Sequence, residues 1–216
     1  YTGRIKLAQW LTNPFMGKET ILSRQEAIKE LSTKAEWNHE FIALGFQNKE
    51  QAKDKEVIEE WLNEKNTFSN LFLKVSCVLL PILSVTSIIL FFLGKINETP
   101  FVVLFFTQLG IIGSCTKRIN KIHDNLSRKF DSIEKYRQLI SLIEKQTFTS
   151  DFLSKLKSVF VNENTSASEN IKELKSLTDK LDARMNIVVA VLLNGILLWD
   201  INVMCGIENW RKKNKD

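Results

Sequence analysis

The sequence predicts an all-α fold, in which long helices form a core and a lever bundle and two of them form an apolar hairpin. Only three prolines and eight glycines occur in 216 residues, so few positions interrupt a helix. Apolar residues recur at helical spacing over long stretches of the chain. Two uncharged runs stand between segments rich in charge, which indicates a polar arm with an apolar tip.

The first expected helices are amphipathic. In the segment GKETILSRQEAIKELS, the residues Ile21, Ile28 and Leu31 fall on one face of a helix and the charged residues on the other. Such stripes are typical of core packing and predict no ligand site. Residues 1–68 are expected to form the first part of the core and an outgoing lever helix. The apolar stripe of that lever helix consists of Val57, Ile58, Trp61, Leu62 and Phe68.

Residues 69–116 are expected to form an apolar helical hairpin. The run VSCVLLPILSVTSIILFFLG holds no charge over about twenty residues, the length that a bilayer demands. A second run, TPFVVLFFTQLGIIGSCT, follows after the short segment KINE. We expect the hairpin to dip into or cross a membrane with both ends on the cytoplasmic side. The basic residues that flank the two runs are Lys74, Lys95, Lys117, Arg118 and Lys121.

A soluble alternative stays open for this hairpin. Thr107, Gln108 and the shortness of the second run favour a pair buried at the centre of a bundle or of an oligomer. Pro81 favours the membrane, because a proline is tolerated inside a membrane helix and more often marks a break in a soluble one. We expect a cytoplasmic protein, attached to the cytoplasmic face of the membrane where the hairpin inserts.

Residues 117–216 are expected to form a returning lever helix and the second part of the core. The segment 117–145 predicts a helix roughly 40 Å long, continuous with the second apolar run. Ser166 and Glu169 have the spacing of a capping box, which predicts a helix start. The run MNIVVAVLLNGILLW is only about fifteen residues long and is interrupted by Asn194 and Gly195, which favours a buried core helix over a span. The seam of the long helix, typical of a coiled coil, consists of Ile119, Ile122, Leu126, Ile133, Tyr136, Ile140 and Ile143.

Composition and spacing predict no chemistry in this chain. Thirty basic residues are interleaved with twenty-five acidic ones, which is typical of solvated helix faces and not of a DNA-binding patch. His39 and His123 are isolated, so no metal-ligand spacing occurs. The sequence holds no phosphate-binding loop and no nucleophile beside a histidine. We expect no catalytic, cofactor-binding or metal-ligating residue, and no DNA binding by this segment alone.

The three cysteines predict a reducing compartment. Cys77, Cys115 and Cys205 lie among apolar residues without paired spacing. Thiols in such surroundings behave as small hydrophobic side chains. An odd number of them is typical of proteins that are not crosslinked by disulfides.

Two blocks of the sequence resemble the MutS family of DNA mismatch-repair ATPases, and they leave out the apolar hairpin. The opening segment TGRIKLAQWLTNPFMGKETILSRQEAIKELS resembles the start of the MutS core domain, at Gly3, Arg4, Trp10, Leu11, Pro14, Ile21, Arg24, Gln25 and Ala27. The segment LDARMNIVVAVLLNGILLWDINVMCGIENW is similar to the return segment of the MutS-related branch, at Arg184, Asn186, Leu193, Asn194, Trp199, Asp200 and Trp210.

This resemblance implies a mechanical role. It implies that the chain is the core and lever of a larger protein whose ATPase domain, with its ATP and Mg²⁺, would follow Asp216, so this segment is itself no enzyme. In the mismatch-repair proteins the lever helices run out to a DNA clamp and back, and here the apolar hairpin stands in place of the clamp. The segment would pass conformational change between its own ATPase domain and its tip. A homodimer of the parent protein is compatible with this role.

Two other interpretations of the same residues stay open. The chain could be a membrane-anchored helical module with a structural or interaction role, whose resemblance to MutS is superficial. It could also be a soluble bundle that hides the apolar hairpin and later releases it into a membrane, as pore-forming toxins are thought to do.

Overall fold

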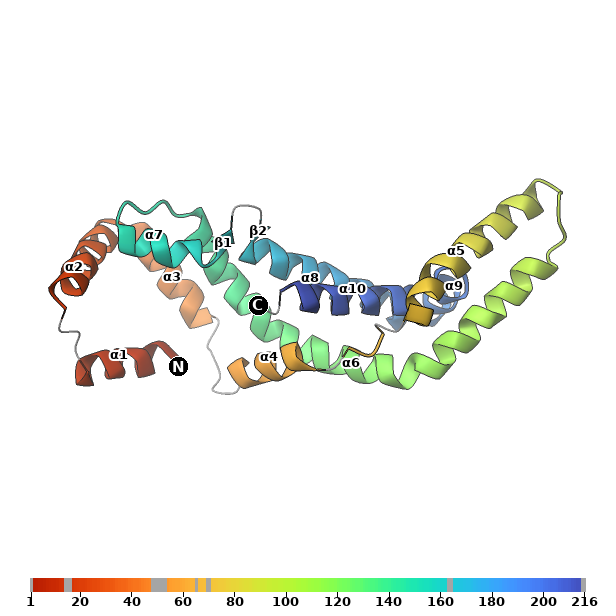
Figure 1. Ribbon diagram of the computed structural model, residues 1–216, viewed down its shortest axis with the longest axis horizontal. Coiled ribbons are helices and arrows are strands. Elements are labelled where there is room, and N and C mark those ends of the chain that lie inside the picture. Colours follow the sequence, from red (N-terminus) through yellow and green to blue (C-terminus); the bar gives the residue numbers. More distant parts are fainter. Residues whose placement is uncertain are drawn as a thin grey trace. The chain divides into compact units, whose positions relative to one another are not determined.

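The predicted all-α class is confirmed by the structure of the chain (Figure 1). The β structure among the described residues is a two-residue antiparallel ladder between β1 (Val161–Asn162) and β2 (Thr165–Ser166). The chain divides into two compact units, which are described separately: residues 1–60 with 129–173, and residues 61–128 with 174–216. The computed structural model describes residues 2–13, 17–47, 54–64, 66–68, 71–162 and 165–214.

The first unit is stabilised by an apolar cluster and by carboxylates that accept hydrogen bonds from backbone amides of other segments. Trp37 stacks on Phe41 with ring centroids 5.2 Å apart and meets Phe148 edge-on at 5.8 Å. Ala27 and Leu153 are buried on two helices that pack together, α2 and α7. The helices of this unit are α1 (Thr2–Thr12), α2 (Lys18–Thr33), α3 (Ala35–Gln47), most of α4 (Asp54–Asn63), the last part of α6 (Thr99–Lys145), α7 (Asp151–Ser158) and the start of α8 (Ala167–Asp182).

The hydroxyl half of the predicted capping box is present at the start of α8. Ser166 Oγ accepts a hydrogen bond from the backbone N–H of Glu169 at 3.3 Å. The same hydroxyl donates to Glu144 Oε2 at 2.8 Å, and Glu144 Oε1 accepts from the Ser168 N–H at 3.1 Å. The N-terminus of α8 is therefore fixed both by its own cap and by a carboxylate from α6.

The second unit is built around the first part of α6. Ile119 and Leu126, two residues of the predicted seam, are fully buried. Leu174 and Leu181 of α8 and Ile201 of α10 are fully buried as well. The remaining helices of this unit are α5 (Leu71–Phe92), the 3₁₀ helix η1 (Ala183–Met185), α9 (Ile187–Leu197) and α10 (Trp199–Lys213).

α6 confirms that the apolar run and the charged arm form one helix. It extends without a break over 47 residues, about 70 Å at 1.5 Å per residue. No proline follows its first turn, and its apolar residues keep their helical spacing through the change from uncharged to charged sequence. The helix is therefore longer than the 117–145 segment that the seam alone predicts.

The run MNIVVAVLLNGILLW was expected to be one buried core helix, and this prediction is wrong. The chain breaks at Leu198, which adopts a left-handed conformation with φ 49°. α9 and α10 meet there at a bend of 77°. One side of α9 stays exposed, with Ile187 78%, Val188 64% and Leu192 51% accessible. The length of the run did not reveal which side of the helix is covered, and α9 and α10 together are long and apolar enough for a broken span or a re-entrant loop.

Candidate membrane-facing surface and adjoining pocket

The apolar hairpin consists of α5, a short turn and the first part of α6 (Figure 1). The 22 residues of α5 reach about 33 Å, enough to cross a hydrocarbon layer of about 30 Å. Gly94 in the turn has φ +66°, a left-handed conformation that glycine adopts without strain. Two stretches, Leu73–Phe92 and Thr99–Asp124, are long and apolar enough to cross a membrane.

Burial in this hairpin is inverted relative to a soluble protein. Ser84 and Gln108 are completely buried and Ser87 is 6% exposed. Most residues that face outward are aliphatic or aromatic, for example Phe92 at 81% and Phe106 at 66% exposure. Soluble proteins rarely expose such a contiguous apolar patch, whereas membrane helices place small and polar residues between helices and apolar ones toward lipid.

Most polar groups inside the hairpin have partners within it, whereas Gln108 Oε1 is buried without a hydrogen-bond partner. Gln108 Nε2 donates to Ser84 Oγ across the two helices, and Ser87 Oγ donates to the Ser84 carbonyl at 2.8 Å. Thr107 Oγ1 donates to Val103 O at 2.7 Å, which satisfies an exposed hydroxyl within its own helix. Such internal pairing is what an environment without water demands. Thr107 and Gln108, which at first favour a soluble fold, are therefore compatible with a membrane hairpin.

The five predicted flanking cations all lie at the ends of the hairpin. Lys74 is exposed in the first turns of α5, and Lys95 is exposed in the turn between the helices. Lys117, Arg118 and Lys121 are exposed on α6 directly after its uncharged stretch. Long basic side chains at these positions can reach the headgroup region from the edge of the apolar layer.

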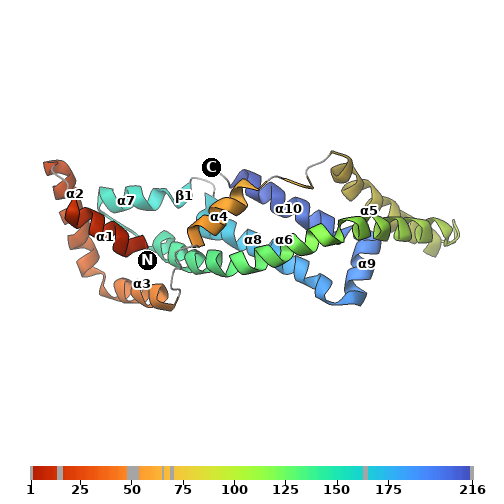
Figure 2. The ribbon, with the colours of Figure 1, turned by 90° about the horizontal axis from the view of Figure 1, so that it is seen from below.

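α9 adds apolar surface next to the hairpin. It packs against α5 (Figure 2), and its Gly195 lies so close to the Phe105 ring of α6 that a Cβ there would come within 2.2 Å of the ring. Asn186 caps α9 by accepting from the Val188 and Val189 amides at 3.0 and 3.3 Å. The exposed side of α9 is therefore apolar and adjoins the exposed side of the hairpin.

The residues of the first MutS-like block lie in the first unit. Gly3, Arg4, Trp10 and Leu11 are exposed on α1. The Arg24 guanidinium lies 4.6 Å from the Trp10 ring centroid and 5.4 Å from that of Phe152, so it joins α1 to α2 and α7. Gln25 is exposed beside it, and Pro14 lies outside the described residues.

The residues of the second block build the corner from η1 to α10. Asn194 Oδ1 accepts the Asp200 N–H at 2.9 Å, and Asp200 Oδ2 lies 3.6 Å from Arg184 Nη2. Trp199 Nε1 donates to Lys180 O at 2.9 Å. Trp210 stacks on Trp61 with ring centroids 6.0 Å apart. These contacts, with the Asn186 cap, connect η1, α9 and α10 at the corner.

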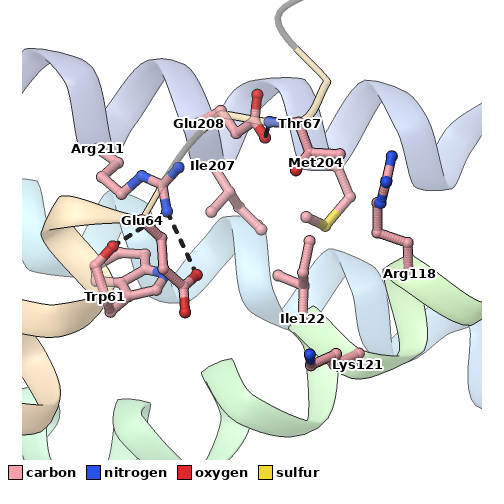
Figure 3. Close-up of a pocket in the computed structure, with 10 residues that line it drawn as sticks. All are labelled: Trp61, Glu64, Thr67, Arg118, Lys121, Ile122, Met204, Ile207, Glu208 and Arg211. Atoms are coloured by element: carbon pink, nitrogen blue, oxygen red, sulfur yellow. Dashed lines mark hydrogen bonds and ion pairs between the residues drawn. The ribbon is translucent and has the colours of Figure 1, made fainter.

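A pocket of about 270 Å³ lies in the second unit beside the base of the hairpin (Figure 3). α6 supplies two cations, Arg118 and Lys121, while α4 and α10 supply most of the rest (Figure 3). Its lining consists of Trp61, Glu64, Thr67, Arg118, Lys121, Ile122, Met204, Ile207, Glu208 and Arg211.

Arg211 and Glu208 use their charges to hold the walls of this pocket. Arg211 donates to Trp61 O at 3.1 Å and to Asn66 Oδ1 at 2.5 Å, and it lies 3.7 Å from Glu64 Oε2. Glu208 accepts from the Phe68 N–H at 3.0 Å with each of its oxygens. α10 thus fixes the segment that leads into α5.

Sequence reasoning missed Glu208 and Arg211. The signal was present, because both stand at helical spacing from Met204 and Ile207, where a continuation of the apolar stripe is expected. A charged residue at such a position indicates a buried partner. Which partner it has depends on which helices meet, and the sequence of α10 does not contain that information.

No metal-binding arrangement occurs among the residues that the structure describes, where no group of three or more His, Cys, Asp or Glu side chains is placed to hold an ion. His123 instead lies 2.9 Å from Asp182 Oδ1. All three cysteines are free thiols. No known protein family matches the sequence, and neither the characterised proteins nor the solved structures contain a significant match.

Proposed function

We propose that this chain is the core and lever of a MutS-like ATPase that is anchored to a membrane by its apolar hairpin. The observation that carries the proposal is the inverted burial of α5 and α6, with Ser84 and Gln108 inside and apolar side chains outside. An environment of lipid explains both halves of this pattern, and water explains neither.

The energetics favour insertion. Thirteen large apolar residues from Val75 to Phe106 are at least 40% exposed. At about 1 kcal/mol for covering the exposed half of each side chain, the gain is on the order of 10 kcal/mol. α9 contributes further apolar surface on the same side as α5. The basic flanks then place both ends of the hairpin at the cytoplasmic face.

The MutS-like part of the proposal rests on the two sequence blocks and on α6. A lever must be stiff, and a helix that continues from the hairpin into the charged arm, with its seam buried, resists bending. The membrane hairpin would stand where mismatch-repair proteins carry a DNA clamp. The partner of this segment would be its own ATPase domain beyond Asp216, which would bind ATP and Mg²⁺, and the segment would act as a mechanical link and not as an enzyme.

Fractionation tests the membrane anchor. The intact chain and a variant lacking residues 76–114 are expressed separately. Each cell lysate is divided into membrane and soluble fractions without detergent, and each protein is then tested for flotation with liposomes. We expect the intact chain in the membrane fraction and the deletion variant in the soluble fraction. An intact chain that remains a well-behaved soluble monomer contradicts the anchor, and if it then lyses liposomes on mild acidification it supports the releasable hairpin instead.

Nucleotide binding tests the MutS-like assignment. The parent protein, expressed with the residues that its gene encodes after Asp216, is expected to bind and hydrolyse ATP. A parent protein that does neither would contradict the assignment and leave a membrane-anchored helical module. Fractionation and nucleotide binding are independent, so either half of the proposal can fail alone.

A further inference from the structure

We infer that the pocket lined by Arg118 and Lys121 binds a phosphate group, supplied by the headgroup of an anionic lipid in the cytoplasmic leaflet. The phosphate chemistry follows from the pocket itself. The lipid source rests on the membrane anchoring proposed above, because it requires the hairpin to be inserted.

Some charged side chains of the pocket already bind other groups of the protein, and others do not. Arg211 is committed to Trp61, Asn66 and Glu64, and Glu208 is committed to the Thr67 and Phe68 amides. Arg118 and Lys121 take part in no hydrogen bond or ion pair within the described part of the chain and are exposed. The two available charges are both positive, and a guanidinium with an ammonium is a typical phosphate-binding pair.

The negative charges nearby do not cancel this pair. Glu64 faces Arg211, whose guanidinium lies 3.7 Å away, and the Glu208 oxygens receive backbone N–H donors. Figure 3 shows Arg118 and Lys121 on α6, across the pocket from the Arg211 and Glu64 pair. Their side chains point to different ends of the α6 wall in Figure 3, but both are long and exposed. Each can therefore turn toward a phosphate at this wall without breaking an existing ion pair.

The position along the chain matches the surface of a membrane. Arg118 follows the uncharged part of α6 by one residue, and Thr67 and Phe68 lead into α5. The pocket thus lies where both legs of the hairpin leave the apolar layer. A volume of about 270 Å³ lies near the lower end of the range for ligand pockets and accommodates a phosphate headgroup.

The test measures thermal stability of the full chain in a neutral detergent. The probes are short-chain phosphatidic acid, phosphatidylcholine with the same acyl chains, glycerol 3-phosphate and inorganic phosphate. The pocket variant is Arg118→Gln with Lys121→Gln. The matched control is Lys117→Gln, which removes an exposed charge from the neighbouring position of α6 that does not line the pocket.

Phosphatidic acid at hundredfold excess over its dissociation constant is expected to raise the unfolding midpoint by at least about 5 °C in the unmodified chain and in Lys117→Gln. The pocket variant should keep its helical circular dichroism and lose the shift. Phosphatidylcholine, whose headgroup carries no net charge, should give no shift. A shift with phosphatidic acid but not with glycerol 3-phosphate assigns the lipid source, and a shift with the soluble phosphates assigns a soluble phosphate ligand.

The inference is overturned if no phosphate probe shifts the midpoint, or if all three proteins shift equally, because the effect is then general charge attraction to the flanks. Neither result bears on the flotation experiment. Failure of the phosphate site and failure of the membrane anchor are thus distinguishable.

Discussion

Several charged side chains of this protein act as clamps between backbone segments that are distant in sequence. Glu30 of α2 receives the amides of Thr149 and Ser150 at 2.9 and 2.7 Å. Glu208 and Arg211 of α10 bind backbone groups of Phe68 and Trp61. A hydrogen bond to a charged group is stronger than one between neutral groups, and an exposed ion pair contributes little by comparison. Loops without regular structure are thereby fixed by single side chains.

The stability that Glu30 contributes by binding the Thr149 and Ser150 amides depends on pH. Desolvation raises the pKa of its carboxyl group, but the hydrogen bonds from Thr149 and Ser150, and the charge of Lys34, outweigh it and leave the pKa below its ordinary value. Since the folded state has the lower pKa, the stabilisation is present above the unfolded pKa and is lost as the pH falls through the folded one.

Glu30→Gln is therefore expected to lower the unfolding midpoint at pH 7, and the difference from the unmodified chain should shrink as the pH falls below about 4. Thermal denaturation followed by circular dichroism across this range measures the effect. Glu26→Gln, which changes an exposed residue of the same helix, serves as the control and should be neutral. A loss that stays constant with pH would show that the clamp acts by packing and not by charge.

At the scale of the helices, the hairpin is held by a polar contact inside an apolar surface. Gln108 of α6 reaches Ser84 of α5, and both side chains are fully buried. Thr107, the next residue, is exposed and satisfies its hydroxyl within α6. The two neighbouring polar residues thus have different roles, one between the helices and one toward the surroundings.

Gln108→Leu is expected to destabilise the pairing of α5 with α6 by about 0.5–2 kcal/mol, the usual range for a hydrogen bond between membrane helices. The matched substitution Thr107→Val, on the exposed side, should change it much less. Unfolding of the micelle-bound chain by a denaturing detergent measures both. Equal effects of the two substitutions would argue against the packing of the helices through Gln108.

Cys77 and Cys205 provide a second test of the helix packing. Cys77 lies on α5 and Cys205 on α10, and these helices are in contact: Asn202 Nδ2 of α10 donates to the Cys77 carbonyl at 3.2 Å, and the Cys205 thiol donates to Phe68 O at 3.6 Å. Mild oxidation by copper phenanthroline and O₂ should crosslink this pair, seen as a disulfide-linked peptide in mass spectrometry. Cys115→Ala should leave the crosslink intact and Cys205→Ala should abolish it. A dominant Cys77–Cys115 product would contradict the placement of α5 on α10.

How far the sequence predicts these helices depends on whether the signal is local. The apolar hairpin and the continuity of α6 follow from runs of adjacent residues, and both were predicted. The end of α9 was not, because Leu198 takes a left-handed conformation that favours glycine or asparagine and gives no warning in a leucine. The pocket was missed for another reason, since Arg118 and Glu208 are ninety residues apart and meet only through tertiary packing.

For the whole molecule, a hairpin with two crossings has one decisive consequence. If the chain crosses the membrane twice, as proposed, α1 to α4 before the hairpin and the charged part of α6 after it lie on the same side of the membrane. Under this proposal, the positive charges of Lys117, Arg118 and Lys121 predict that this side is the cytoplasm. Only the turn around Gly94, with Lys95 and Asn97, would reach the opposite face.

Cysteine accessibility decides this topology. In a chain whose three native cysteines are replaced by alanine, single cysteines are placed at Asn97 in the turn, at Ser158 at the end of α7 and at Lys213 at the end of α10, and each is treated with a membrane-impermeant maleimide. Asn97→Cys should react in intact bacterial spheroplasts. Ser158→Cys and Lys213→Cys should react only after the membrane is broken. The charged segments around these two positions would have to enter the apolar layer to reach the far face, at a free-energy cost of several kcal/mol per charge. If all three react only after disruption, the turn does not reach the far face, and the hairpin enters the membrane from the cytoplasm without crossing it. If Ser158→Cys or Lys213→Cys reacts in intact spheroplasts, α5 and α6 do not form the two-crossing hairpin, and the orientation set by the basic flanks is wrong.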